Sequence, residues 1–191
     1  MGHIERRQKE KEEMRKRIMD TTLNIAVSEG WDAVTIRKIA NAIEYTPPIV
    51  YEHFKNKDDL FDELILMGFR ILHKEYDLLR TKESDPKKIL SLLSVNHWEF
   101  AFEHKELYQL MFNFRKPMPN DEIRKVGNWI KNLFVKITND EDLSEELMFN
   151  WMCLIQGYIF HAMQIELPPE LTQISPKLLF TNAIERFLKS I

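Results

Sequence analysis

The chain has 191 residues, of which 44% are hydrophobic and 11% aromatic, and its formal net charge is -3. This hydrophobic content supports a packed core, so the composition excludes an intrinsically disordered protein. The single cysteine, Cys153, excludes a disulfide framework and a zinc ribbon, because neither can be built from one thiol.

The N-terminal residues lack the apolar segment of a signal peptide, and nowhere do 18 apolar residues follow one another without a charge. We therefore expect a soluble, cytoplasmic protein that does not contact a membrane. Glycine is rare and alternating Val/Thr-rich runs are missing, which favours an all-α fold. Residues 1–57 carry 11 Lys and Arg against 9 Asp and Glu, a small positive balance that can attract phosphate.

The first predicted helix covers residues 5–29, where apolar residues such as Ile18 and Ile25 recur at helical spacing and Gly30 follows as a stop. Acidic and basic residues four positions apart indicate a solvated face on this helix. The alternative for its N-terminal cations is phosphate contact by Arg6, Arg7 or Lys9.

Two short helices follow. In TIRKIANAI, Thr35 can cap a helix whose apolar residues fall on one side. In TPPIVYEHF, Thr46 suits the N-cap, and Pro47 and Pro48 occupy positions where a missing N–H costs nothing. The two prolines therefore start the third helix and fix its entry.

The remaining helices are longer. Asn56 caps a fourth helix that extends to about residue 79 and carries a broad apolar surface. Later starts are predicted at Asp85-Pro86, Asn120, Asp142 and Ser175-Pro176, which gives helices near residues 86–103, 105–115, 120–137, 143–165 and 176–190. The predicted fold class is all-α, with about nine helices.

Two short helices joined by a tight turn, behind a longer one, are typical of a helix-turn-helix domain, whose second helix lies in the DNA major groove. The segment GWDAVTIRKIANAIEYTPPIVYEHFKNKDDLFDELI resembles the DNA-binding signature of the TetR/AcrR family of bacterial transcriptional repressors, without a gap from Gly30 to Leu60. The resemblance implies a DNA-binding domain in residues 1–57 and an effector-binding and dimerisation domain in residues 58–191.

The resemblance also implies roles for single residues. Thr35 and Thr46 match hydroxyls that cap helices and touch phosphates. Tyr51 matches a tyrosine that meets the DNA backbone, and Lys57 matches a lysine that opens the fourth helix against a phosphate. His53 stands where the family often has a histidine near the backbone, with a structural role as the alternative.

The sequence departs from the family pattern around the third helix. Ile43-Glu44-Tyr45 replaces the usual Ala-Gly-Val, and the two prolines replace a small or polar residue and a glycine. Prolines cannot donate to base edges, so we expect readout through Tyr45, through Glu52 toward a cytosine amine, through thymine methyls, or through DNA shape. The predicted DNA-binding residues are Thr35, Tyr45, Thr46, Pro47, Pro48, Tyr51, Glu52, His53 and Lys57.

Two segments of the C-terminal half, HWEFAFEHKELYQLMFNF and NWMCLIQGYIFHAM, resemble a TetR subgroup with a Trp-His-Gly helix, although Gln156 replaces the histidine. Large soft side chains with a few polar anchors are typical of an effector pocket, and filling of an ordinary core is the alternative. The predicted pocket residues are Trp98, Phe102, Tyr108, Met111, Phe112, Trp129, Trp151, Ile155 and Gln156.

The last two predicted helices are amphipathic and long enough to pair with their copies in a four-helix interface. The family resemblance implies a homodimer of this kind, which would place two recognition helices about 34–36 Å apart, one DNA turn. The predicted interface residues are Tyr158, Leu179, Phe180, Ala183, Phe187 and Ile191.

The motifs of an all-α enzyme are missing: Glu-x-x-His, His-Glu-x-x-His, a Gly-rich phosphate loop and Gly-x-Ser-x-Gly do not occur. We expect Cys153 to be a buried, inert thiol, and we expect no catalytic residue, metal or cofactor. The leading hypothesis is a homodimeric repressor that an apolar or amphipathic small-molecule effector releases from its double-stranded DNA operator. A regulator without an effector and an all-α enzyme are the alternatives.

Overall fold

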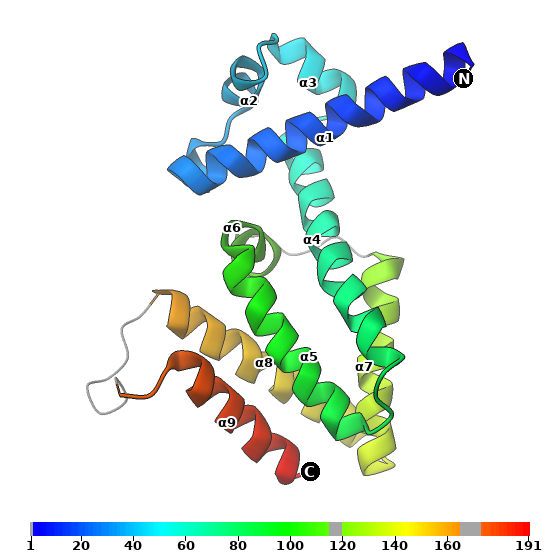
Figure 1. The fold of residues 1–191 in the computed structure, drawn as a ribbon, viewed down its shortest axis with the longest axis vertical. Coiled ribbons are helices and arrows are strands. Elements are labelled where there is room, and N and C mark those ends of the chain that lie inside the picture. Colours follow the sequence, from blue (N-terminus) through cyan, green and yellow to red (C-terminus); the bar gives the residue numbers. More distant parts are fainter. Residues whose placement is uncertain (1, 115–119, 165–172) are drawn as a thin grey trace. The chain divides into compact units, whose positions relative to one another are not determined.

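The computed structural model describes residues 2–114, 120–164 and 173–191. In these ranges the chain forms nine α-helices and no β-strand, so the predicted all-α fold is confirmed (Figure 1). None of these helices is both long and apolar enough to span a membrane. The helices are α1 (His3–Glu29), α2 (Ile36–Ala42), α3 (Pro47–His53), α4 (Lys57–Arg80), α5 (Pro86–Glu103), α6 (Lys105–Gln109), α7 (Asp121–Thr138), α8 (Glu141–Gln164) and α9 (Pro176–Lys189). A 3-10 turn, η1 (Trp31–Ala33), precedes α2, and a π-helix, η2 (Leu110–Phe114), follows α6.

The chain forms two compact units, and α4 contributes to both. Unit 1 contains the described residues 2–68 and 104–114, and unit 2 contains the described residues 69–103, 120–164 and 173–191. These units are defined by packing. The functional division predicted between residues 57 and 58 stays a prediction.

Unit 1 holds α1, α2, α3, the first half of α4, and α6. Its core includes Ile18, Ile39 and Val50, one from each of the first three helices, and all three are inaccessible to solvent. Trp31 links this core to α6, because its indole Nε1–H donates to the carbonyl of Glu106 at 3.0 Å. The Trp31 ring also packs edge-on against Phe61 of α4, with ring centroids 5.1 Å apart.

Gly68 of α4 lies where unit 1 leaves no room for a side chain. A Cβ atom at this position would be 2.3 Å from Sδ of Met111 and 3.1 Å from Cγ of Leu107. Met111 is itself fully buried. The absence of a side chain at Gly68 therefore lets α4 pack closely against α6 and η2.

Unit 2 holds the second half of α4 together with α5, α7, α8 and α9. Trp151 of α8 is fully buried, and its Nε1–H donates to the hydroxyl of Ser94 at 2.9 Å. The ring of Trp98 stacks on that of Phe180, with centroids 4.8 Å apart. The core of unit 2 thus contains large aromatic rings from α5, α8 and α9.

Two predictions about α8 are wrong. The cap is Asp140 rather than the predicted Asp142, since Asp140 accepts a hydrogen bond from the N–H of Leu143 at 3.0 Å, and the helix therefore begins at Glu141. Asn139, with a left-handed φ of 57°, ends α7 just before it. Cys153 is exposed rather than buried, because α8 turns other residues toward the core.

The helix predicted over residues 105–115 is also interrupted. It is α-helical only through Gln109, and the five residues that follow form the π-helix η2. Residue 115 lies outside the described residues. The sequence pattern missed this change because apolar spacing does not separate α from π turns over so short a segment.

Candidate nucleic-acid interface

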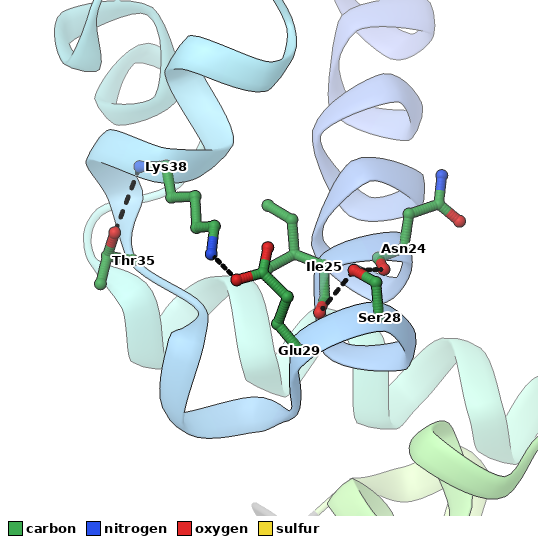
Figure 2. Close-up of polar contacts among 6 residues, drawn as sticks. All are labelled: Asn24, Ile25, Ser28, Glu29, Thr35 and Lys38. Atoms are coloured by element: carbon green, nitrogen blue, oxygen red, sulfur yellow. Dashed lines mark hydrogen bonds and ion pairs between the residues drawn. The ribbon is translucent and has the colours of Figure 1, made fainter.

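The start of α2 is fixed by its cap and by an ion pair. The hydroxyl of Thr35 accepts a hydrogen bond from the N–H of Lys38 at 3.2 Å, as the sequence predicts for an N-cap (Figure 2). The ammonium of Lys38 pairs with the carboxylate of Glu29 at the end of α1 (Figure 2). Ser28, in the last turn of α1, donates its hydroxyl to the carbonyls of Asn24 and Ile25 (Figure 2). Of these contacts, the Lys38–Glu29 ion pair is the one that joins the first turn of α2 to the last turn of α1.

The turn between α2 and α3 carries backbone strain at Glu44, whose φ is 64°. The N–H of Tyr45 donates to the carbonyl of Ala40 at 2.9 Å and closes the turn around this residue. Residues with a Cβ atom populate this left-handed region at a cost, whereas glycine does so freely. Glu44 occupies the position where the family pattern has glycine, and the structure shows why glycine suits it.

Glu44→Gly is therefore expected to raise the free energy of unfolding by about 0.5–1 kcal/mol, because it relieves the strain at this φ. Urea denaturation monitored by circular dichroism would measure the change. Glu44→Ala is the matched control, since it removes the same carboxylate but keeps a Cβ atom. An equal gain from both substitutions would show that charge, and not backbone strain, is responsible.

The third helix begins as predicted, with Pro47 and Pro48 in its first two positions. Thr46 occupies the N-cap position, but its side chain makes no capping hydrogen bond. Instead its carbonyl accepts from the N–H of Ile49 at 3.1 Å. The prolines do not depend on a side-chain cap, because neither has an N–H that needs a partner.

The outer face of this segment is strongly exposed. Tyr45 and Tyr51 have 44% and 54% of their surface exposed, although both are large side chains. Val50 is fully buried and fixes which side of α3 faces the core. The other predicted DNA-binding residues differ in exposure: Thr35, Thr46, Pro48 and Glu52 are exposed, whereas Pro47, His53 and Lys57 are half-buried.

His53 is the last residue of α3, and Lys57 is the first residue of α4. Nδ1 of His53 is buried without a hydrogen-bond partner among the described residues. Burial lowers the pKa of His53, and the charge of Arg15 lowers it further. The ammonium of Lys57 lies 5.0 Å from the ring centroid of Phe61, which leaves its charge at the start of α4. Asn56 caps that helix as predicted, since its Oδ1 accepts from the N–H of Asp59 at 2.8 Å.

Two arginines of α1 hold both ends of the segment that contains α3. Arg17 donates to the carbonyl of Ile43 at 2.9 Å, before α3, and its guanidinium lies 5.8 Å from the ring centroid of Tyr45. Arg15 donates to the carbonyl of His53, after α3. The acceptors are backbone carbonyls 26 and 38 residues away in the sequence, so a local sequence pattern cannot predict these contacts.

The predicted effector residues are divided between the two units. Tyr108, Met111 and Phe112 belong to unit 1, and the other six belong to unit 2. In unit 2, Trp151 and Ile155 are fully buried and Trp98 nearly so, whereas Phe102 is 43% exposed. Trp129 lies under the guanidinium of Arg80, which is 4.1 Å from its ring centroid, and Gln156 is half-buried.

Unit 2 also contains a buried polar pair and a surface pocket. The hydroxyl of Tyr76 and Nδ1 of His97 form a buried hydrogen bond of 3.0 Å between α4 and α5. A surface pocket of about 200 Å³ includes none of the predicted effector residues and is lined by Glu75, Leu78, Leu79, Lys82, Leu92, Val95, Asn96 and Glu99. Within the described ranges, no group of three His, Cys, Asp or Glu side chains could hold a metal ion.

The predicted interface residues of α8 and α9 do not form one exposed stripe. Phe180 and Ala183 are buried inside unit 2. The other four, Tyr158, Leu179, Phe187 and Ile191, are half-buried. The large apolar side chains that these two helices expose most are others: Phe149 is 68% exposed, Leu178 51% and Phe160 47%.

Comparisons with known proteins agree with this arrangement. Residues 18–64 match the family described as "Bacterial regulatory proteins, tetR family". The HTH-type transcriptional repressor KstR of Mycolicibacterium smegmatis is 25% identical over 138 residues, which cover 70% of this chain and 67% of that protein.

Solved structures with 14% and 16% identity share the fold. One is a TetR-family transcriptional regulator from Bordetella parapertussis, with a TM-score of 0.66 over 92% of this chain and 94% of the other. Another is a TetR/AcrR-family transcriptional regulator from Thermobifida fusca, with a TM-score of 0.66 over 92% and 97%.

Proposed function

This chain is a transcriptional regulator of the TetR family, and from that premise we propose that it is a homodimeric repressor that a small molecule releases from DNA. The observation that carries the proposal is the segment around α3, which exposes Tyr45 and Tyr51 while Arg15 and Arg17 hold its two ends. A helix held in this way can enter a DNA major groove in one defined orientation. The similar M. smegmatis protein is described as a repressor, which supports the direction of control.

On DNA, we assign the two ends of α3 different tasks. Tyr45, Pro47 and Pro48 lie at its start, where side chains reach base edges in helix-turn-helix complexes. Tyr51 and Lys57 lie toward and beyond its end and bind backbone phosphates. Phosphate contacts set the register of the helix and dominate the affinity, whereas base contacts set the sequence preference.

Tyr51→Phe and Lys57→Ala are therefore expected to weaken binding to every DNA sequence about equally. For Lys57→Ala we expect the slope of log K against log salt to become shallower by about 0.9, the value for one lost phosphate contact. Fluorescence anisotropy with an operator selected from a random pool and with a random duplex, at several salt concentrations, measures both quantities. Glu52→Gln is the control and should change sequence preference, because Glu52 is the residue of α3 that we expect to face a cytosine amine. A change of preference from Lys57→Ala would contradict the assignment.

We propose that dimerisation uses the exposed face of α8 together with α9. Phe149, Cys153 and Phe160 follow one another at spacings of four and seven residues, so they lie on one face of α8. The exposed Leu178 of α9 adds to the apolar surface. Such a surface is typical of a protein interaction site, and a two-fold axis would pair it with its own copy. This proposal uses other residues than the buried Phe180 and Ala183.

Phe149→Lys is expected to convert the dimer to a monomer and to lower the affinity for a two-half-site operator at least tenfold, because each subunit then binds alone. Sedimentation velocity measures the mass, and the reaction rate of Cys153 with a maleimide measures burial of the same face. Leu92→Lys is the control, since Leu92 is another large apolar side chain that unit 2 exposes, on α5. A wild-type chain that sediments as a monomer would exclude this interface.

We further propose that the effector is apolar or amphipathic and enters unit 2. Its core offers large aromatic rings together with the buried Tyr76–His97 pair, a composition suited to a ligand that is apolar with few polar groups. The effector releases DNA only through its different affinity for the two states, typically about 1–3 kcal/mol. A panel of fatty acids and other apolar compounds, screened by thermal shift and then by loss of anisotropy, tests this. No shift with any of them would favour a regulator without an effector.

A further inference from the structure

The N-terminal half of α1 has no part in the core. Before Met14, every α1 residue whose side chain the structure describes is exposed. Within unit 1 the N-terminal end of this helix extends past α3 (Figure 1). Ile18 is the first fully buried residue of α1. Packing therefore does not explain why the helix extends for several turns on the N-terminal side of Ile18.

Charge is sorted around this part of the helix. On one side, Arg6 pairs with Glu10 at 2.9 Å and Lys9 with Glu13 at 3.8 Å. These two pairs, four residues apart in each case, help to keep an exposed helix formed. They also neutralise the cations on that side. Arg6 and Lys9, which the sequence analysis offered as phosphate contacts, are thus already engaged with carboxylates.

On its other side the helix itself carries no carboxylate, and among the described residues the one carboxylate that pairs with a cation of this side is Glu63 of α4, 3.3 Å from the guanidinium of Arg15. At 100° per residue, Arg7, Lys11, Arg15 and Ile18 lie within about 80° of one another, and the nearest glutamates are about 100° from Lys11. No residue three or four positions from Lys11 is acidic. Glu10, three positions after Arg7, already accepts from Arg6. In the described part of the chain no carboxylate pairs with Arg7 or Lys11.

This cationic side lies on the same side of α1 as α3. Ile18 lies on this side and is fully buried in the core of unit 1. Arg15 lies on the same side and donates to the carbonyl of His53 at the end of α3. Lys11 is close enough for its charge to contribute to the lowered pKa of His53. The line from Ile18 through Arg15 to Lys11 and Arg7 therefore passes the C-terminal end of α3 and continues outward.

We propose that Arg7 and Lys11 form a phosphate-binding strip that extends the DNA contact beyond α3. This inference rests on the proposed DNA-binding function, and it adds the N-terminal half of α1 to α3 as a part of the protein that contacts DNA. Arg7 and Lys11 are four residues apart, which is about 6 Å along the helix axis. A DNA strand carries one phosphate per about 3.4 Å of its axis, so the two cations are far enough apart for each to bind a different phosphate. Binding of this kind reads no bases, and it acts on the duplex that flanks the part read by α3.

The test compares two double variants that remove the same charge from the same helix. Arg7→Gln with Lys11→Gln is expected to reduce the slope of log K against log salt by about 1.8 and the affinity about tenfold or more, equally for operator and random duplex. Arg6→Gln with Lys9→Gln, on the opposite side, is expected to leave the slope unchanged. Both variants alter exposed residues, and equal urea midpoints would confirm that neither loses its fold.

Shortening the duplex gives an independent readout. Removing flanking base pairs should weaken the wild-type protein and leave the Arg7, Lys11 variant unaffected, since that variant has lost its contact with the flanks. Equal changes of slope in the two double variants would overturn the strip, because a general effect of charge would then explain both. No change in either would overturn it as well. A wild-type chain without salt-dependent DNA binding would overturn the DNA-binding function itself.

Discussion

Lowering the pH from 8 to 5 is expected to reduce the free energy of unfolding by about 3 kcal/mol, because two buried histidines of unit 2 resist protonation. Burial, together with repulsion from a protonated His73, lowers the pKa of His97 to about 3. Burial also lowers the pKa of His73 to about 4, against the attraction of Asp77 and Glu122. Both side chains are neutral in the folded protein at pH 7.

The direction follows from proton binding. Below about pH 6.5, the ordinary pKa of histidine, the unfolded chain takes up protons that the folded chain does not. The contribution of each histidine is therefore complete above pH 6.5 and is lost as the pH falls toward the folded pKa. His97 is 2% exposed and is expected to account for about 2 kcal/mol at pH 5, and the half-buried His73 for less.

Urea denaturation at several pH values measures this loss. His97→Asn is expected to be less stable than the wild type at pH 8, because Tyr76 loses its buried partner, but to show a shallower dependence on pH. His161→Asn is the control, since His161 is an exposed histidine of α8. If His97→Asn kept the full pH dependence, the source of the acid sensitivity would lie elsewhere.

Gly68→Val is expected to destabilise the protein by about 3 kcal/mol through overpacking. The side chain would be built into Met111 and Leu107, and Met111 is fully buried and cannot swing into solvent. The penalty should exceed the gain of about 1 kcal/mol that removing a glycine from a helix normally gives. Thermal and urea denaturation would measure the net effect.

Gly127→Ala, compared with Gly68→Ala, separates the effect of overpacking from the general effect of removing a glycine from a helix. Gly127 also lies inside a helix, α7, but a Cβ atom there would meet nothing within 4 Å. Replacing it should stabilise the protein by up to about 1 kcal/mol. In addition, Gly68→Ala should be better tolerated when Met111 is also replaced by alanine. Equal effects of Gly68→Ala with and without Met111 would contradict the role of this contact.

Helix starts were the part of the fold that local sequence predicts best. Thr35, Asn120 and Ser175 each accept the expected capping hydrogen bond. These predictions succeed because a cap is decided within four residues, by groups that are neighbours in sequence. The prediction of Asp142 as the cap of α8 is wrong by only two residues, because Asp140 has the same side chain and caps the helix instead.

Local sequence predicts less well which side of a helix packs into the core and which side is exposed. Cys153 lies in an apolar run of α8, which does not reveal which side of the helix faces the core. Phe180 belongs to an apolar stripe of α9, and such a stripe does not reveal whether it packs inside its own subunit or against a second copy. The roles of Arg15 and Arg17 could not be predicted either, because their acceptors are distant backbone carbonyls. For the candidate interface, the sequence indicated the exposed residues of α3 but not what holds that helix in place.

The hydrogen bond of Trp31 to Glu106 also has a spectroscopic consequence. The chain has four tryptophans, and Trp31 is the one in unit 1, whereas Trp98, Trp129 and Trp151 belong to unit 2. With the latter three replaced by phenylalanine, the remaining fluorescence would report on unit 1 alone. The emission of Trp31, 6% exposed and bonded to a carbonyl, would shift to longer wavelength when α6 detaches. A single fluorophore already in the sequence thus makes local opening of unit 1 observable separately from unfolding of unit 2.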